Sequence, residues 1–354
     1  MFYRENGQFK TTYRSDQQIF PIRQDRVFML ALLVLGFGVV PLVASSYYLS
    51  VILIPVVILA LAALGTNILI GYCGQISLGS GAFMAVGAYG AYNVIMRIPG
   101  TPLIVALLMG GVFAAVFGVM FGLPSLRVKG LYLAVTTLAA QFFADWMFYR
   151  VKWLTMDSPS ISVTAPDLTF FGLSLQSYPA KYVFCLSVLL LFALAAKNLV
   201  RSAIGREWMA IRDMDVAAEV IGIRPVHAKL TAFAMSSFFI GVAGALWAFV
   251  HLGSWEALAF DVNRSLNLLF MVIIGGLGSI IGSFFGAAFI VILPLLLNQI
   301  PSWLGIPLST AFTSHLEFMI FGALIVYFLI VEPHGLARLW AIGKEKLRLW
   351  PFPH

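Results

Sequence analysis

Long apolar runs, separated by shorter polar segments, dominate the chain from residue 27 onward. A helix crosses the hydrocarbon core of a bilayer in roughly 20 apolar residues, and ten segments meet or approach that length. The predicted spans are residues 27–45, 47–71, 76–97, 102–123, 130–150, 180–200, 228–250, 265–277, 280–298 and 315–331. The pattern predicts an all-α, polytopic membrane helix bundle of about ten transmembrane helices.

The polar segments divide the chain into an N-terminal segment, residues 1–26, a transmembrane domain, residues 27–335, and a C-terminal tail, residues 336–354. With an even number of spans and a cytoplasmic N-terminus, 17 of the 22 Lys and Arg residues lie on the inner side. Basic residues concentrate in the cytoplasmic loops of membrane proteins. We therefore expect a multi-pass protein of the bacterial inner (plasma) membrane with both termini cytoplasmic.

Composition supports the membrane class, because 61% of the 354 residues are hydrophobic and only 10% are charged. Soluble domains are ~25% charged. The net charge of +7 is then explained by loop orientation, so membrane lipid is expected around the chain and no nucleic-acid partner.

Ionisable side chains are missing from most of the predicted spans. No Asp, Glu, Lys, Arg or His occurs in residues 27–96, 98–126 or 265–314, although such residues usually mark ion and proton pathways. The sequence also has no catalytic cluster, no metal-ligand spacing and no phosphate-binding G-x-x-x-x-G-K-[ST] loop. We therefore expect no enzymatic activity, cofactor or metal in this chain, and any ATP hydrolysis would take place in separate cytosolic subunits.

The glycine-rich stretch Gly71–Gly90 is the least regular of the predicted membrane segments. Dense glycines can break a helix, and broken helices at membrane depth form binding sites for uncharged or zwitterionic solutes. A polar stripe on the span 130–150 accompanies this stretch, and its Thr137 and Gln141 share a face at i, i+4 spacing. The candidate pathway residues are Gln75, Ser77, Gly79, Ser80, Gly81, Thr136, Thr137, Gln141 and Asn267. The alternative is packing alone, with each threonine bonded to its own helix backbone.

Other glycines are spaced for close contact between helices. Small residues four apart let two backbones approach each other in a membrane. Gly118 and Gly122 form one such face, and Gly278, Gly282 and Gly286 form another. We expect both faces to serve helix packing.

The longest inner loop, residues 201–227, contains a short amphipathic helix. Ile211, Met214, Ala218 and Ile221 follow helical spacing and predict one apolar face. Gly222 suits the C-terminal cap, and the proline at position 225 prevents continuation. The helix either rests on lipid headgroups or docks into a cytosolic partner, and its four acidic residues favour the partner because anionic lipid repels them.

Four motifs resemble those of the permease subunits of branched-chain amino acid ABC importers, the LivM-like family. They are "SLGSGAFMAVGAY" (77–89), "GLPSLRVKGLYLAVTTLA" (122–139), "GREWMAIRDMDVAAEVIGI" (205–223) and "GGLGSIIGSFFGA" (275–287). Relatives of this family also carry urea, amides and aromatic acids. The resemblance implies that the 205–223 motif is a coupling helix. Its coupling residues are Gly205, Arg206, Ala210, Ile211, Arg212, Met214, Ala217, Ala218, Ile221 and Gly222.

The resemblance further implies a transmembrane permease subunit that translocates a small hydrophobic or zwitterionic solute. Its partners would be a second homologous permease, two cytosolic ATPase subunits, and a periplasmic or lipid-anchored solute-binding protein. The alternative is a stand-alone secondary transporter or channel for a small neutral solute. The two differ in whether ATPase subunits bind the helix between residues 206 and 222.

Overall fold

The computed structural model describes residues 11–12, 23–125, 131–156, 162–166, 168–170, 173–304, 310–331 and 334–349. Most of the N-terminal segment 1–26 and the last five residues of the C-terminal tail 336–354 lie outside this part of the chain, as do residues 126–130 of the motif 122–139. The described part is almost entirely helical, which confirms the predicted all-α class.

The first half of the bundle contains seven α-helices, three π-helical segments and one 3-10 turn among the described residues. In chain order they are α2 (Arg23–Val34), η1 (Leu35–Val39), α3 (Val40–Val43), α4 (Ser46–Tyr48), η2 (Leu49–Leu53), α5 (Ile54–Asn67), η3 (Ile68–Tyr72), α6 (Ser80–Arg97), α7 (Leu103–Ser125), α8 (Leu131–Arg150) and η4 (Lys152–Thr155). The π-helical segments continue neighbouring α-helices, so α2 to α3 and α4 to η3 each form one long rod.

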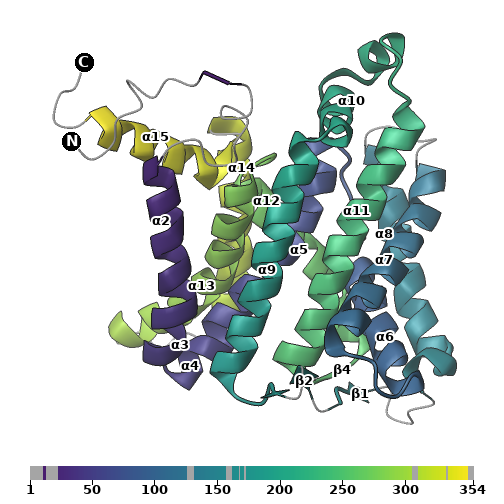
Figure 1. Ribbon diagram of the computed structural model, residues 1–354, viewed down its shortest axis with the longest axis vertical. Helices are drawn as coiled ribbons and strands as arrows, with labels where there is room; N and C mark the ends of the chain where they lie inside the picture. The colour runs from purple at the N-terminus through teal and green to yellow at the C-terminus, as the bar shows by residue number, and fades with distance from the viewer. Residues whose placement is uncertain are drawn as a thin grey trace.

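The second half begins after a loop that follows α8. Its helices are α9 (Tyr178–Arg201), α10 (Ala203–Val220), α11 (Pro225–Leu246), η5 (Trp247–Leu252), η6 (Ala257–Phe260), α12 (Val262–Gly275), α13 (Ile280–Leu304), α14 (Thr310–Val331) and α15 (Gly335–Leu349). Figure 1 shows α10 and α15 at the same end of the bundle as the start of α2, with α15 beside α2.

Two very short antiparallel strand pairs lie at the opposite end (Figure 1). In one, β1 (Val163–Thr164) pairs with β4 (Ser254–Trp255); in the other, β2 (Thr169–Phe170) pairs with β3 (Leu173–Ser174). The first pair joins the loop after α8 to the end of the α11–η5 rod, so it closes that end of the bundle.

Seven helical segments within the described ranges are long and apolar enough to cross a membrane. They are Arg26–Val43, Ser46–Tyr72, Leu103–Pro124, Tyr178–Arg201, Pro225–Leu252, Ala257–Gly275 and Ile280–Gln299. Most of the predicted spans 76–97, 130–150 and 315–331 is also helical, as α6, α8 and α14, but these helices are not among the seven. The polytopic bundle is therefore confirmed, whereas the count of ten spans stays a prediction.

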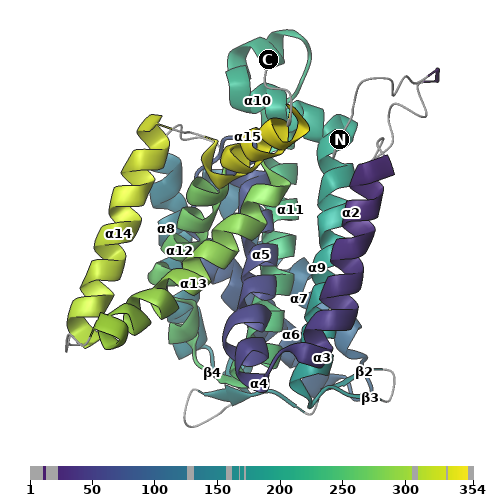
Figure 2. The ribbon, with the colours of Figure 1, turned by 90° about the vertical axis from the view of Figure 1, so that its left-hand side faces the viewer.

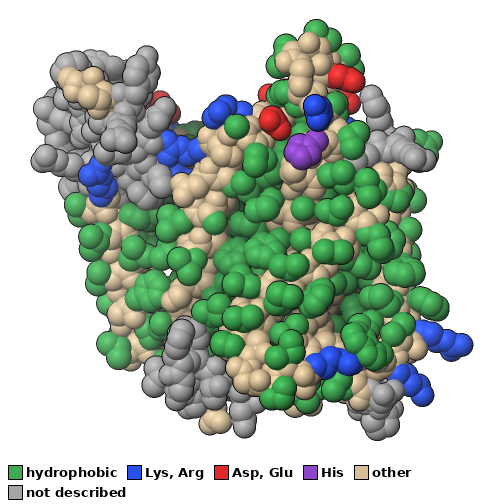
Figure 3. Space-filling model, turned by 45° about the vertical axis from the view of Figure 1, so that its right-hand side comes forward, with side chains coloured by type: hydrophobic (Ala, Val, Ile, Leu, Met, Phe, Trp, Pro, Cys, Tyr) green, Lys and Arg blue, Asp and Glu red, His purple; other side chains and the backbone are tan. Residues whose placement is uncertain are grey.

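The core lies where α5, α6, α7 and α11 meet. A side chain at Gly87 of α6 would collide with the backbone of Gly241 in α11, so glycine is required for these two helices to touch. Large apolar side chains cover the outside: Val116 is 63% exposed and Leu191 is 66% exposed. Figure 3 shows this apolar band between two ends that carry the charged groups, the surface expected of a protein surrounded by lipid.

α14 leans away from the rest of the bundle (Figure 2). Its inner side contributes buried Phe321 and Phe328, while Met319 and Ile330 on other sides are more than 70% exposed.

Candidate functional site

The glycine-rich stretch breaks the helix, as its composition predicts. The rod that includes α5 ends at Tyr72, residues 73–79 have no helical structure, and α6 starts at Ser80. Gly74 has φ of +71°, a conformation that glycine adopts without steric cost.

Side chains from two other helices satisfy the backbone N–H groups that this break leaves without helical partners. The Leu78 N–H donates to Thr137 Oγ1 of α8 at 2.9 Å, and the Gly81 N–H donates to Ser265 Oγ of α12 at 2.7 Å. The Ala82 N–H donates to Gln141 Oε1 at 2.6 Å. The first four N–H groups of a helix need such partners, so α8 and α12 together cap α6 inside the bundle.

Gln141 is the centre of this cap. Besides accepting from Ala82, its Oε1 accepts from the Ser265 hydroxyl at 3.1 Å. Its Nε2 donates to the Phe260 carbonyl at 2.8 Å and to Asp145 Oδ1 at 3.1 Å. The side chain is fully buried, and all of its hydrogen-bonding capacity is used. Gln141 therefore ties α6, α8 and the start of α12 together.

The predicted pathway residues separate into two groups. Ser77, Gly79, Ser80, Gly81, Thr137 and Gln141 come together around the α6 cap, and Gln75 lies in the same break, where its side chain donates to the Cys73 carbonyl. Thr136 lies apart and donates to Leu133 of its own helix, while Asn267 borders a separate cavity.

The two glycines of the cap are needed for close packing. A Cβ atom at Gly79 would lie 2.7 Å from the Thr137 carbonyl oxygen, and one at Gly81 would lie 2.7 Å from that of Phe260. Both distances are shorter than a normal contact. These glycines therefore have a packing role in this conformation, and a pathway role stays a prediction.

A second glycine-rich break separates α12 from α13. Gly276 has φ of +121° and Gly278 has φ of +73°, and α13 begins only at Ile280. The expectation that Gly278 shares a helix face with Gly282 and Gly286 is therefore wrong, because Gly278 belongs to the turn. Gly282 and Gly286 do pack against α12, at the backbones of Gly275 and Met271.

The other predicted packing face, Gly118 and Gly122 of α7, lies against α11. A side chain at Gly118 would collide with Ser237, and one at Gly122 would lie 3.2 Å from the Phe233 ring.

Asn67 joins the two breaks. Its Oδ1 accepts from the Gly278 N–H at 2.9 Å, and its Nδ2 donates to the Ser279 carbonyl at 2.8 Å and to Ser283 Oγ at 3.1 Å. A Cβ atom at Gly71 would collide with both Asn67 and Gly278. Sequence reasoning missed Asn67 and Ser265, and the available signal for Asn67 was its position as an isolated amide in an apolar run.

The predicted helix in the inner loop is α10, but it is bent. Met214 has φ of −163° and ψ of 96°, which interrupts the helix between Asp213 and Asp215. The predicted single apolar face is therefore wrong. Ile211 and Ala218 are 4% and 2% exposed, whereas Met214 and Ile221 are 65% and 74% exposed. The predicted C-terminal end is confirmed, because Gly222 has φ of +92° and α11 begins at Pro225.

Arg212 connects α10 to the first break. Its Nη1 donates to the Gly71 carbonyl at 2.9 Å, and its Nη2 pairs with Asp213 Oδ1 at 2.9 Å. Nearby, buried Trp208 donates from Nε1 to Thr231 Oγ1 of α11 at 3.0 Å. α10 is therefore fixed to α11 and to the carbonyl of Gly71, beside the contact between the two breaks. We call Asn67, Gly71, Arg212 and Gly278 the inner node.

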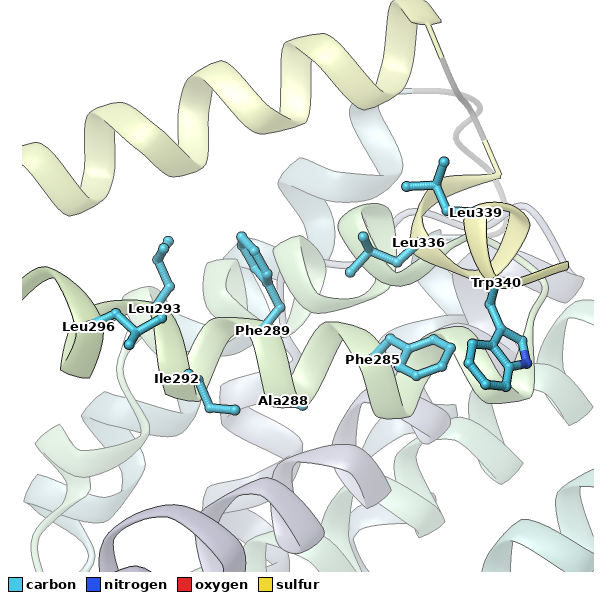
Figure 4. A pocket seen from close by; sticks show the side chains of 9 residues that line it. All are labelled: Phe285, Ala288, Phe289, Ile292, Leu293, Leu296, Leu336, Leu339 and Trp340. Carbon is cyan, nitrogen blue, oxygen red and sulfur yellow. The ribbon is translucent and has the colours of Figure 1, made fainter. Parts of the chain in front are cut away.

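A groove of about 500 Å³ lies between α13 and α15. Figure 4 shows its lining residues, which are Phe285, Ala288, Phe289, Ile292, Leu293, Leu296, Leu336, Leu339 and Trp340. Its only side-chain polar atom is the Trp340 indole nitrogen. Solute sites combine apolar walls with a few polar groups that fix orientation, so this groove is a poor candidate for one.

Comparison with known proteins agrees with these features. The family model described as "Branched-chain amino acid transport system / permease component" matches residues 48–329. The LivM permease of the high-affinity branched-chain amino acid transport system of Escherichia coli is 27% identical over 336 residues, covering 88% of this chain and 75% of the relative.

More distant relatives include other importers. The fructose import permease FrcC of Rhizobium meliloti is 26% identical, covering 78% of this chain and 79% of its own. The autoinducer 2 import permease LsrC of Enterobacter sp. is 27% identical, covering 77% and 80%. No solved structure matches the chain. Because the family model spans most of its length, the chain belongs to the family of permease components of branched-chain amino acid transport systems.

Proposed function

We propose that the chain is the transmembrane permease subunit of an ATP-binding cassette importer for a small hydrophobic or zwitterionic solute. A branched-chain amino acid, or a related amide or aromatic acid, would be delivered by a periplasmic or lipid-anchored binding protein. Family membership and the transport systems named for the relatives support this proposal.

The observation that carries the proposal is the exposed apolar tip of α10. Met214, Val220 and Ile221 are 65%, 83% and 74% exposed, on a helix that is bonded through Arg212 to the inner node. Exposed apolar groups on such an anchored helix fit a cleft on a cytosolic ATPase. Hydrolysis by two such ATPases, paired with this chain and a second homologous permease, would displace α10 and so shift both helix breaks to open the inner gate.

Co-purification of the ATPase subunits tests the proposal. Met214→Asp places a charge on the exposed tip, where an unpaired buried charge in the docked complex is strongly destabilising. We expect this variant to lose ATPase binding. Ala218, although predicted to belong to the same face, is buried within the chain and is unsuitable for this test.

Leu258→Asp is the matched control, because Leu258 is 66% exposed in η6, near the end with the strands. It should retain the ATPases. If the wild-type chain moves solute without any ATPase bound, it is a stand-alone transporter or channel and the proposal is wrong.

A further inference from the structure

A second cavity, of about 510 Å³, lies between η2, α5, η5, α12 and α13. It borders the starts of α9 and α12, near the strand-bearing end of the bundle (Figure 1). Aliphatic side chains such as Ile54, Leu59 and Ile290 form one part of its wall. The other part of the wall is polar and includes Arg264, His251 and Asn267, which distinguishes this cavity from the α13–α15 groove. We call this cavity the Arg264 cavity.

The Arg264 guanidinium has no anionic partner among the described residues. It lies over the Trp247 ring, 4.6 Å from its centroid, and makes no hydrogen bond or ion pair with the described part of the chain. Asp261 is one turn away, but its Oδ1 accepts the Arg264 backbone N–H at 3.1 Å and its Oδ2 accepts from Asn263 Nδ2 at 2.7 Å. This acid caps the helix instead of pairing with the guanidinium.

Arg97 shows the contrast with a structural arginine of the same chain. Its guanidinium also stacks on an indole ring, 3.8 Å from the centroid of Trp153. However, its Nε donates to Asn93 Oδ1 at 3.0 Å and its Nη2 donates to the Trp153 carbonyl at 2.8 Å. Stacking alone therefore does not account for Arg264, whose guanidinium donors have no acceptor among the residues that the structure describes.

Three further side chains around the Arg264 cavity have unused hydrogen-bonding groups. Trp247 is 5% exposed, and its buried Nε1 has no hydrogen-bond partner in the described part of the chain. The His251 ring lies 4.3 Å from that of Trp247. Neither His251 nor the Asn267 carboxamide makes a hydrogen bond with the described residues. Buried polar groups are normally satisfied, so several unused donors around one cavity indicate a ligand that accepts hydrogen bonds.

We propose that the Arg264 cavity binds the carboxylate of a small solute, with the solute's apolar part against the aliphatic wall. The planar guanidinium can donate two parallel hydrogen bonds to a carboxylate, and the volume suits a small molecule. The assignment rests on the proposed function in one respect only: it takes the carboxylate to belong to the transported solute as that solute enters the permease.

Binding to the full-length chain in phosphatidylcholine nanodiscs tests the site, with 4-methylpentanoate and its neutral amide, 4-methylpentanamide, as probes. The wild-type chain should bind the acid more tightly than the amide. Arg264→Met should weaken binding of the acid by about 10-fold or more, because a charge-assisted pair is lost. Binding of the amide should change less than twofold, which also shows that the variant is folded. Arg264→Lys keeps the positive charge but not the planar guanidinium. Its affinity for the acid should therefore lie between those of the wild-type chain and Arg264→Met.

Arg97→Met is the matched control and should leave both affinities unchanged. Equal binding of acid and amide by the wild-type chain, or an Arg264→Met variant that binds the acid normally, would overturn the assignment. Nanodiscs containing phosphatidylglycerol distinguish a lipid phosphate: if this lipid displaces the acid and Arg264→Met abolishes the competition, the cavity is a headgroup site and the proposal is wrong. ATPase co-purification with the same variants tests the proposed function separately.

Discussion

Gln141 is the residue whose surroundings define the candidate site most completely. Its carboxamide accepts from the Ala82 N–H of α6 and donates to the Phe260 carbonyl, and the side chain is fully buried. An unsatisfied buried donor or acceptor costs about 1–3 kcal/mol, so the effect of removing this side chain should be large.

Gln141→Leu keeps the approximate volume and leaves the Ala82 N–H, the Ser265 hydroxyl and the Phe260 carbonyl without this partner. We expect a loss of about 2–4 kcal/mol of stability, seen as a lower melting temperature of the purified chain. Thr136→Val is the control, because Thr136 bonds only within its own helix and should change stability by less than 1 kcal/mol. A normal melting temperature for Gln141→Leu would contradict the capping role.

Gly81→Ala should destabilise the chain, because the added Cβ would lie within 2.9 Å of three oxygen atoms: the carbonyls of Phe260 and Asp261 and Oε1 of Gln141. Gly38→Ala, whose Cβ would meet nothing within 4 Å, should not. Thermal melting and uptake should be measured together. A variant that melts normally but transports no solute would show a pathway role instead of a packing role.

Part of this site could be predicted from the sequence. The i, i+4 relation of Thr137 and Gln141 showed that they share a face, and the glycine density showed where a helix breaks. The partners of Asn67 lie more than 200 residues away, and a single amide in an apolar run does not identify them. The role proposed for Arg264 could not be predicted from the sequence, because its cavity is formed by helical segments that are far apart along the chain.

At the scale of elements, local signals predicted the break before α6 and the C-terminal end of α10, whereas the turn at Gly276 and Gly278 was not predicted. The bend in α10 was not predictable in this way, because Met214 is neither glycine nor proline and no sequence signal marks its extended backbone. The bend separates the face that packs within the chain from the tip that is exposed. Under the proposed function, coupling would therefore depend on the anchor at Arg212 as well as on the exposed tip of α10.

Arg212→Met should separate ATPase binding from coupling. The tip of α10 stays intact, so we expect the ATPases to co-purify, while solute-stimulated ATP hydrolysis falls at least about fivefold because the bond to Gly71 is lost. Arg224→Met is the control: Arg224 is an exposed arginine at the N-cap of α11 and is not one of the predicted coupling residues. Normal stimulation in Arg212→Met would show that the inner node does not transmit the motion.

For the whole molecule, the apolar pattern predicted the class and the order of the helices. The span count is harder to derive, because α6 begins inside the bundle at a cap formed by other helices, and polar residues lower the hydropathy of α6 and α8. The position of such helices within the bundle is recognised from the helices that pack around them and not from their own composition.

Cysteine labelling tests the sidedness expected from the basic residues. The native Cys73 and Cys185 are almost fully buried and should react slowly. In intact cells, an impermeant maleimide should label Ile98→Cys, which follows α6, and should label Val220→Cys on α10 only after the membrane is opened. Ile98 and Val220 are 59% and 83% exposed. Labelling of both, or of neither, in intact cells would contradict the topology.

The most direct test of the importer assignment is solute uptake into proteoliposomes that contain this chain with its sister permease, the ATPases and the binding protein. The account predicts uptake only when ATP is present on the α10 side and the binding protein is on the opposite side. Met214→Asp should abolish this uptake, and Leu258→Asp should retain it. Equal uptake without ATP, driven by an ion or solute gradient, would contradict the account.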